Sequence, residues 1–207
     1  MTRAAFVLVI GLLGASGLSA SAATEQNPLV IPGRSIGNVS LGMTVAQVRK
    51  AIGRPAQVER QSLSPSRFHV RYYYEARQLG IEFVGTRASF GRPATKARVT
   101  RIETTSERAR LRNGMGVGTR ERQLMRVYGR RLDCPPWKKS ELSDGAGAGT
   151  GIIAVSLLRP CYLRASGNAV TVFVSRIPPQ GYRGFGIVKA SDIPKARVWE
   201  IIVRRAG

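Results

Sequence analysis

Histidine and cysteine are scarce in this sequence of 207 residues, which contains one histidine, His69, and two cysteines, Cys134 and Cys161. Together with dispersed carboxylates they form no ligand cluster of the kind that binds zinc or another transition metal. A general base at His69 would need a nucleophile or an orienting carboxylate, and Glu82 is the one obvious candidate. We favour a solvent-facing histidine, and we therefore expect no catalytic residues, no metal, no cofactor and no enzymatic activity.

Acidic residues are also few, because 12 Asp and Glu stand against 33 Lys and Arg, which gives a formal net charge of +21. They form no close pair suited to sugar hydrolysis. The positive charge attracts polyanions and anionic surfaces, although a GC-biased genome would give the same arginine-rich composition without selection. Arg122, Arg126 and Arg130 form a stripe that we interpret as a solvated basic face or as a candidate anion-binding site. The arginine-dense stretch around them has no regular interleaving of aromatic residues and no recognisable nucleic-acid motif, so we expect no specific nucleic acid partner.

Long apolar runs are absent, since none reaches the roughly 18 residues of a membrane-spanning helix. The run AAFVLVIGLLGASGL follows Arg3 and precedes small polar residues. This pattern is typical of a secretory signal peptide over residues 1–22, cleaved near Ala22, and a retained N-terminal anchor helix is the alternative. Residues 23–35 are expected to form an extended leader. Cleavage would leave the mature chain outside the cytoplasm, either secreted or periplasmic.

The two cysteines of an exported chain favour a disulfide between Cys134 and Cys161. The bond would close a loop of roughly 28 residues and stabilise the fold by about 3 to 4 kcal/mol. Two free thiols or an intermolecular bond are the alternatives.

Two pairs of similar segments occur along the chain. LGMTVAQVRKAIG at residues 41–53 resembles VGTRERQLMRVYG at 117–129, and ARVTRIETT from Ala97 resembles ARVWEIIVR from Ala196. Thr44 and Gln47 form a capping-box pattern ahead of a helical run, and we expect the second helix to start at Thr119. The recurrence predicts an α+β fold of two tandem repeats, each a short helical element packed on an antiparallel β-sheet. Residues 36–106 would form the first repeat, 107–118 a bridge, and 119–207 the second repeat with a glycine-rich insertion.

The alternating pattern of RFHVRYYY predicts a strand with two different faces. His69, Arg71 and Tyr73 share one face, opposite the other aromatic residues. We interpret these three residues, with Trp137 in the loop beside Cys134, as a candidate binding surface. Packing within the loop is the alternative for Trp137.

The segments ARVTRIETT and ARVWEIIVR both have two apolar residues at an odd spacing. Val99 and Ile102 would point to opposite faces of a regular strand, and Val198 and Ile201 repeat this spacing. The two residues of each pair would share one face only if the strand bulges, and the repeated spacing favours an inherited geometry over chance.

The motif GMTVAQVRKAIGRP and its echo resemble the family of exported helix-and-sheet modules that includes the β-lactamase inhibitor protein and, as a single copy, the BamE/SmpA outer-membrane assembly lipoproteins. The resemblance implies a tandem module with a non-catalytic role in protein binding or envelope assembly. The chain has no cysteine near the cleavage site for lipid attachment, and no inhibitor contact residue can be matched. We predict an exported protein-interaction module whose partner is another exported or envelope protein. The alternative is a basic extracytoplasmic protein that binds anionic polymers or membrane surfaces.

Overall fold

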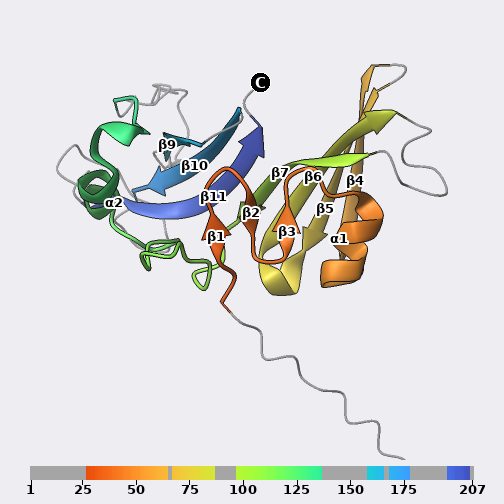
Figure 1. Ribbon diagram of the computed structural model, residues 1–207, viewed down its shortest axis with the longest axis horizontal. Helices are drawn as coiled ribbons and strands as arrows, with labels where there is room; N and C mark the ends of the chain where they lie inside the picture. Colours follow the sequence, from red (N-terminus) through yellow and green to blue (C-terminus); the bar gives the residue numbers. More distant parts are fainter. Residues whose placement is uncertain are drawn as a thin grey trace, which may run out of the picture.

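The fold is built around one antiparallel sheet of eight strands in the spatial order β4-β5-β6-β7-β11-β10-β9-β8 (Figure 1). A three-stranded sheet, β1-β2-β3, and two helices, α1 and α2, accompany it. The structure is a computed structural model that describes residues 27–64, 67–86, 97–136, 158–165, 168–177 and 195–205. The predicted signal peptide, Trp137 and the glycine-rich insertion lie outside the described residues.

The large sheet contains the longer strands of the described chain. They are β4 (Gln57–Ser64), β5 (Arg67–Tyr74), β6 (Leu79–Thr86), β7 (Arg98–Thr104), β9 (Leu158–Arg164), β10 (Ala169–Arg176) and β11 (Arg197–Arg205), with the short β8 (Leu132–Asp133). The small sheet consists of β1 (Val30–Ile31), β2 (Ser35–Ile36) and β3 (Val39–Ser40), and the helices are α1 (Val45–Ile52) and α2 (Glu121–Tyr128).

The prediction of two tandem α+β repeats is wrong. The described chain is mostly β, and α1 and α2 contain only eight residues each. Moreover, β7 and β11 pair directly, with Arg101–Thr104 opposite Ile201–Arg204. Strands from both predicted repeats therefore belong to one continuous sheet, and this non-local pairing leaves no signal in the pattern of either strand.

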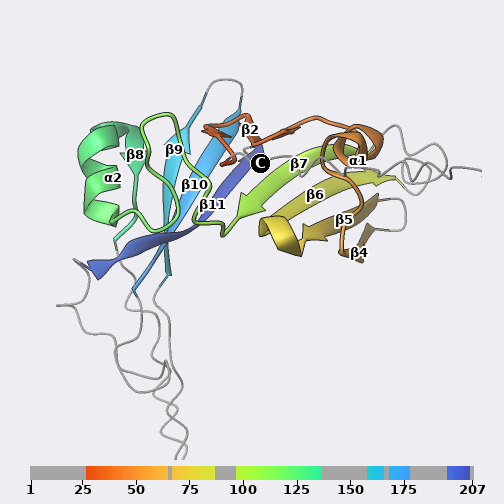
Figure 2. The same cartoon turned by 90° about the horizontal axis from the view of Figure 1, so that it is seen from below.

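Both helices and the small sheet lie on one face of the large sheet (Figure 2). At the start of α1, Thr44 Oγ1 accepts a hydrogen bond from the backbone N–H of Gln47 (3.2 Å), and Gln47 Oε1 accepts one from the N–H of Thr44 (2.8 Å). The predicted capping box is thus confirmed. Val45 and Val48 turn the apolar side of α1 to the core, where both are buried.

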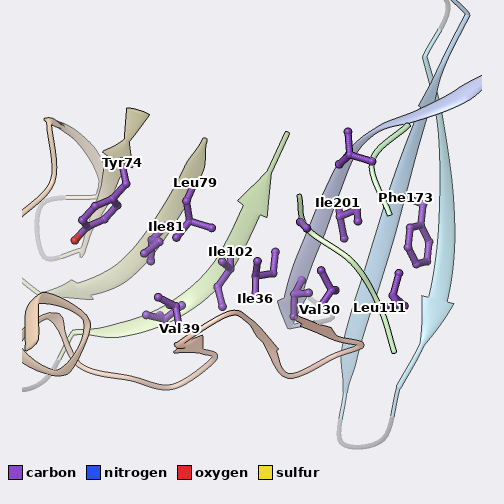
Figure 3. Packing of buried hydrophobic residues seen from close by; sticks show 14 of the residues in the cluster. Val30, Ile36, Val39, Tyr74, Leu79, Ile81, Ile102, Leu111, Phe173 and Ile201 are labelled. Atoms are coloured by element: carbon purple, nitrogen blue, oxygen red, sulfur yellow. The ribbon is translucent and has the colours of Figure 1, made fainter. Parts of the chain in front are cut away.

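The core fills the space between these elements and the large sheet. Figure 3 shows Ile36 and Val39 of the small sheet beside Ile102 of β7 and Ile81 of β6. Phe173 of β10 continues the same cluster of buried residues on the other side of β11. One hydrophobic core therefore spans both halves of the sheet.

The chain enters α1 and α2 with the same backbone geometry. Gly42 (φ 83°) and Gly118 (φ 87°) turn the chain ahead of each helix, in a conformation that favours glycine. The segment that leads into each helix then forms backbone hydrogen bonds with a neighbouring strand, β7 for α1 and β11 for α2. The hydrogen bonds are Gly42 N to Val99 O (2.9 Å), Val99 N to Met43 O (2.8 Å), Gly118 N to Val198 O (2.8 Å) and Val198 N to Thr119 O (2.9 Å). The recurrence in the sequence therefore reflects a local docking geometry.

Of the two alternatives for the odd spacing, the structure shows the β-bulge in both strands. The register shifts between Glu82 and Phe83 where β6 meets β7, and between Val174 and Ser175 where β10 meets β11. In each case the two apolar residues of the bulged strand reach the same core. These residues are Val99, Ile102, Val198 and Ile201, all 2% exposed or less.

The second helix begins at Glu121, two residues later than expected. Arg120 is its N-cap and provides no side-chain cap. Thr119 Oγ1 instead accepts a hydrogen bond from Gly116 N (2.9 Å) within the preceding turn. In the described part of the chain, neither helix has the length and hydropathy needed to cross a membrane.

Candidate functional site

The face of the large sheet opposite the helices carries a cluster of charged side chains. Alternation along β5 buries Tyr72 and Tyr74 in the core and turns the residues between them to the other side. The register then places Arg71 beside Glu82, and Glu82 beside Arg101. We call this cluster the polar face, and its members are His69, Arg71 and Tyr73 of β5, Glu82 of β6, and Arg101 and Glu103 of β7.

Glu82 lies at the centre of the polar face. Its Oε2 atom is 3.2 Å from His69 Nε2, and its Oε1 atom is 3.8 Å from Arg71 Nε and 3.7 Å from Arg101 Nε. All four side chains are partly buried, with exposed fractions between 16% and 31%. One carboxylate therefore orients three cationic or protonatable groups on two neighbouring strands.

Glu103 is held more deeply than Glu82. Its side chain is 10% exposed and pairs with the guanidinium of Arg71 and with Arg101 Nη2 (2.8 Å). Gly80, opposite Glu103 in β6, leaves space for this carboxylate, because a Cβ atom there would lie 2.7 Å from Glu103 Oε1. A side chain at residue 80 would therefore displace the carboxylate from its ion pairs.

Tyr73 completes the polar face towards β4. Its phenol donates a hydrogen bond to Glu59 Oε2 (3.0 Å), and the guanidinium of Arg71 lies 4.9 Å from the centre of its ring. Burial raises the pKa of Tyr73, and the hydrogen bond to Glu59 adds to the rise. The phenol is thus a neutral donor at physiological pH, and the contacts fix the orientation of the ring.

Two hollows flank the polar face. One, of about 240 Å³, is lined by Tyr73, Gly80, Glu103 and Glu200 among others. Burial raises the pKa of Glu200, although the positive charges of Arg101 and then Arg71 oppose this. The polar face therefore extends to a protonatable carboxyl on β11.

The second hollow, which we call the edge recess, has a volume of about 360 Å³ and is lined by Glu59, Arg60, Gln61, His69 and Arg71. His69 Nε2 lies near Glu82 Oε2 but makes no hydrogen bond within the described residues. The lining includes no serine, threonine, cysteine or lysine that would act as a nucleophile. In the described residues no group of three His, Cys, Asp or Glu side chains is placed to hold a metal ion. The side chains that line the edge recess are charged or hydrogen-bonding, and such groups can bind groups of complementary charge.

The predicted arginine stripe lies on a different surface. Arg122 and Arg126 are exposed on α2, and Arg130 is exposed in the turn Gly129–Arg131 that follows it. α2 packs through Leu124 on the face of the sheet opposite the polar face. The structure thus brings His69, Arg71 and Tyr73 together and separates them from the arginine stripe.

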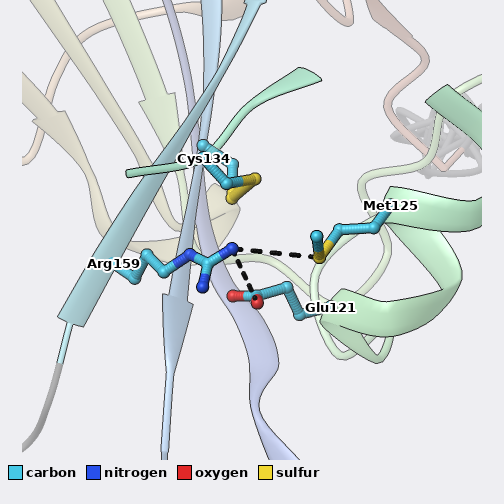
Figure 4. The surroundings of a disulfide bond; sticks show 5 residues. Glu121, Met125, Cys134 and Arg159 are labelled. Carbon is cyan, nitrogen blue, oxygen red and sulfur yellow. Dashed lines mark hydrogen bonds and ion pairs between the residues drawn. A yellow bond between two sulfur atoms is a disulfide. The ribbon is translucent and has the colours of Figure 1, made fainter. Parts of the chain in front are cut away.

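Cys134 and Cys161 form the predicted disulfide (Figure 4). Such a bond indicates an oxidising, extracytoplasmic compartment. Beside it, Arg159 Nη2 lies 3.4 Å from Glu121 Oε1 and donates a hydrogen bond to Met125 Sδ (3.8 Å). The side chains of Arg159 and Glu121 are only 10% and 7% exposed.

The sequence analysis missed this buried ion pair, although the similarity of the two helices contains a signal for it. Glu121 is the first residue of α2, and the buried Val45 is the first residue of α1. A position that is apolar in one helix entry is therefore acidic in the other. An acid at such a position needs a buried cation, which Arg159 supplies.

A further cavity of about 580 Å³ lies between the small sheet, the turn Glu75–Arg77 and the segment after β7. Its lining mixes apolar residues such as Ile36 and Ile52 with charges of both signs, including Arg77 and Glu107. This mixture identifies no single class of ligand.

No family model matches the sequence, and no curated protein matches it. Among solved structures, the chain is similar to the uncharacterized protein yfeY from Escherichia coli, with a TM-score of 0.47 and 11% sequence identity. The match covers 84% of this chain and 97% of that one. A similarity of this size carries no functional argument, so the geometry of the polar face is the basis for a proposal.

Proposed function

We propose that this chain is a non-enzymatic extracytoplasmic protein that binds another exported or envelope protein through the polar face. The disulfide supports the compartment. The proposal includes export by a signal peptide at residues 1–22, with cleavage near Ala22, into the periplasm or the medium. The resemblance of residues 41–53 and 117–129 to exported binding modules agrees with this role.

The observation that carries the proposal is that ion pairs hold the charged side chains of the polar face in fixed orientations. Glu82 and Glu103 hold Arg71 and Arg101 in place, and Arg71 also lies over the ring of Tyr73. Arginine and tyrosine frequently dominate the binding energy of protein interfaces. Side chains that are already ordered lose less entropy when a partner binds. Because the polar face carries both signs of charge, it fits a protein surface better than a uniformly charged polymer.

A capture experiment tests the proposal. Tagged protein would be used to recover partners from the envelope fraction of the source organism, and calorimetry would measure the affinity of the purified pair. We expect Tyr73→Ala to weaken binding at least about ten-fold, because it removes the phenol and the ring beneath Arg71. Gln123→Ala on the exposed surface of α2 is the matched control and should bind like the wild type.

Thermal unfolding of both variants would show that they remain folded. Repeated capture without any protein partner would contradict the proposal. So would a partner whose affinity is unchanged by Tyr73→Ala.

The exposed arginine stripe on α2 favours a second candidate function, the binding of anionic polymers or membrane surfaces. Arg122, Arg126 and Arg130 are all exposed, and the acid beside them, Glu121, is buried against Arg159. Binding to heparin or to anionic vesicles should fall steeply as salt rises from about 50 to 200 mM. Replacing the three arginines with glutamine should reduce that salt dependence, and an absence of binding at low salt would remove this candidate.

A further inference from the structure

The large sheet has one long open edge. β4 pairs with β5 on one side, and no described strand pairs with its other side. Edge strands of natural proteins are usually short, bulged, covered, or protected by charged side chains, above all lysine, or by proline. β4 carries the charged residues Glu59 and Arg60 but neither lysine nor proline. Its register with β5 is regular from Gln57 to Ser62 and shifts only between Ser62 and Ser64. Its outward N–H and C=O groups therefore form a template for an additional strand.

The opposite edge of the sheet is built differently. β8 contains two residues, Leu132 and Asp133, and Cys134 directly after it is bonded to Cys161 of β9. β8 covers only Tyr162 and Leu163 of β9, and the part of β9 beyond it contains Pro160. The covalent link and the proline make this edge a poor template. Of the two edges, only β4 therefore favours the addition of a strand.

Charges alternate from strand to strand up to the open edge. The register aligns Glu59 of β4, Arg71 of β5, Glu82 of β6 and Arg101 of β7 in one row across the polar face. Opposite charges on neighbouring strands attract, and like charges repel. Because the row ends with an acid at β4, the next position outward favours a cation.

Glu59 is accessible to such a cation. Its side chain is exposed, and its carboxylate accepts hydrogen bonds from two neutral donors, Tyr73 Oη (3.0 Å) and Gln57 Nε2 (3.3 Å). The ion pairs found among the described residues do not include Glu59. The edge recess beside it provides about 360 Å³ for a long side chain.

We propose that β4 is the docking edge at which an extended segment of the partner protein adds as an antiparallel strand, with an arginine or lysine opposite Glu59. This inference rests on the proposed protein-binding function and specifies how the partner is recognised. Backbone hydrogen bonds to β4 supply affinity. The charge row and the edge recess set the register, because a slip by one residue moves the cation to the other face of the sheet.

A synthetic peptide probes the docking edge directly. The capped hexapeptide Thr-Thr-Glu-Arg-Val-Thr, paired antiparallel with residues 57–62, places its arginine opposite Glu59 and its glutamate opposite Arg60. We expect slower hydrogen exchange at alternate backbone amides of β4 when the peptide is added, because only the outward N–H groups gain partners. Two N-methylated versions of the peptide are the matched controls, one methylated on the odd and the other on the even residues. The amide groups of a strand point alternately to its two sides, so only one version loses the N–H groups that face β4. That version should not bind, and the other should.

A charge swap then tests the role of Glu59. Glu59→Lys should weaken binding of the peptide about five-fold or more, since an attraction becomes a repulsion. The same variant should bind the peptide in which glutamate replaces the arginine more tightly than the wild type does. A net charge of +21 opposes any general attraction of a cationic side chain, so the swap reports on the local contact.

Three results with the purified protein would overturn the proposal. Both N-methylated isomers could bind equally well, or hydrogen exchange of the β4 amides could stay unchanged at saturating peptide. The protein could also form a dimer in solution whose β4 amides are protected without peptide. The last would assign the edge to a second copy of this chain. If a captured partner depends on Tyr73 and none of its extended segments protects β4, strand addition is wrong and the proposed function stands. If no partner is captured at all, the proposed function fails.

Discussion

The buried ion pair between Glu121 and Arg159 allows a quantitative test of how α2 is attached to the sheet. The perturbation replaces each partner with an apolar residue, singly and together. Glu121→Val copies the residue that α1 carries at the same place, Val45, which is 2% exposed. Arg159→Met retains most of the volume of the arginine side chain while removing its charge.

The expected magnitude follows from the distance and the burial. Two unit charges 3.4 Å apart attract with about 5 kcal/mol at an effective dielectric constant of about 20. Removing each ion from water costs several kcal/mol, so the intact pair contributes little net stability. Each single variant removes one member of the buried ion pair and should lose about 3 to 5 kcal/mol in the free energy of unfolding. The double variant should lose far less than the sum, and the coupling energy should be about 2 kcal/mol or more.

Urea denaturation at pH 7 would measure the free energy of unfolding of all four proteins. High salt should change the coupling energy little, because buried pairs are weakly screened. The reasoning would be refuted if the losses of the two single variants simply added in the double variant. Additivity would mean that Glu121 and Arg159 do not compensate one another inside the protein.

Three further predictions concern covalent and titratable groups. Reduction of the Cys134–Cys161 bond, which spans a sequence separation of 27 residues, should lower the free energy of unfolding by about 3 to 4 kcal/mol. Urea midpoints with and without reductant would measure this loss, and equal midpoints would contradict it. Burial raises the pKa of Tyr74 to about 12, so the folded state keeps the phenolic proton longer than the unfolded state does. Stability should therefore be lost as pH rises from about 10 towards 12, and Tyr74→Phe should be free of this loss in thermal unfolding. Burial also raises the pKa of Glu200, so ionisation of this group costs stability as pH rises through the carboxyl range. Glu200→Gln should melt at a higher temperature than the wild type at pH 7 and at the same temperature below pH 4, and a lower melting temperature at pH 7 would argue against the shift.

Most features predicted correctly from the sequence depend on neighbouring residues, and the disulfide is the exception. The capping box needs only Thr44 and Gln47, three residues apart, and the bulges are encoded in the spacing of residues such as Val99 and Ile102. The pairing of Cys134 with Cys161 was predictable because the chain has no other cysteines. Local patterns of this kind are set by backbone geometry and residue type, so no knowledge of the tertiary structure is required.

The wrong prediction and the missed residues concern contacts between distant segments. The strand patterns are equally compatible with two separate sheets and with one joined sheet. The pairing of β7 with β11 decides between these alternatives. Alternation along β5 grouped His69, Arg71 and Tyr73, but the contribution of Glu103 depends on the bulge that reorients β7. The burial of Glu121 is explained only by Arg159 on a distant strand.

The place of β11 in the sheet affects how the molecule is assembled. Residues 197–205 form the strand between β7 and β10, so the sheet cannot close before the ribosome has added residue 205. Contacts between segments so far apart along the chain slow folding, because a long loop must be closed before they form. A sheet that stays incomplete until β11 has been synthesised suits translocation in an unfolded state. The same order of events would leave the edges of β7 and β10 open in the nascent chain and dependent on chaperones until the missing strand arrives.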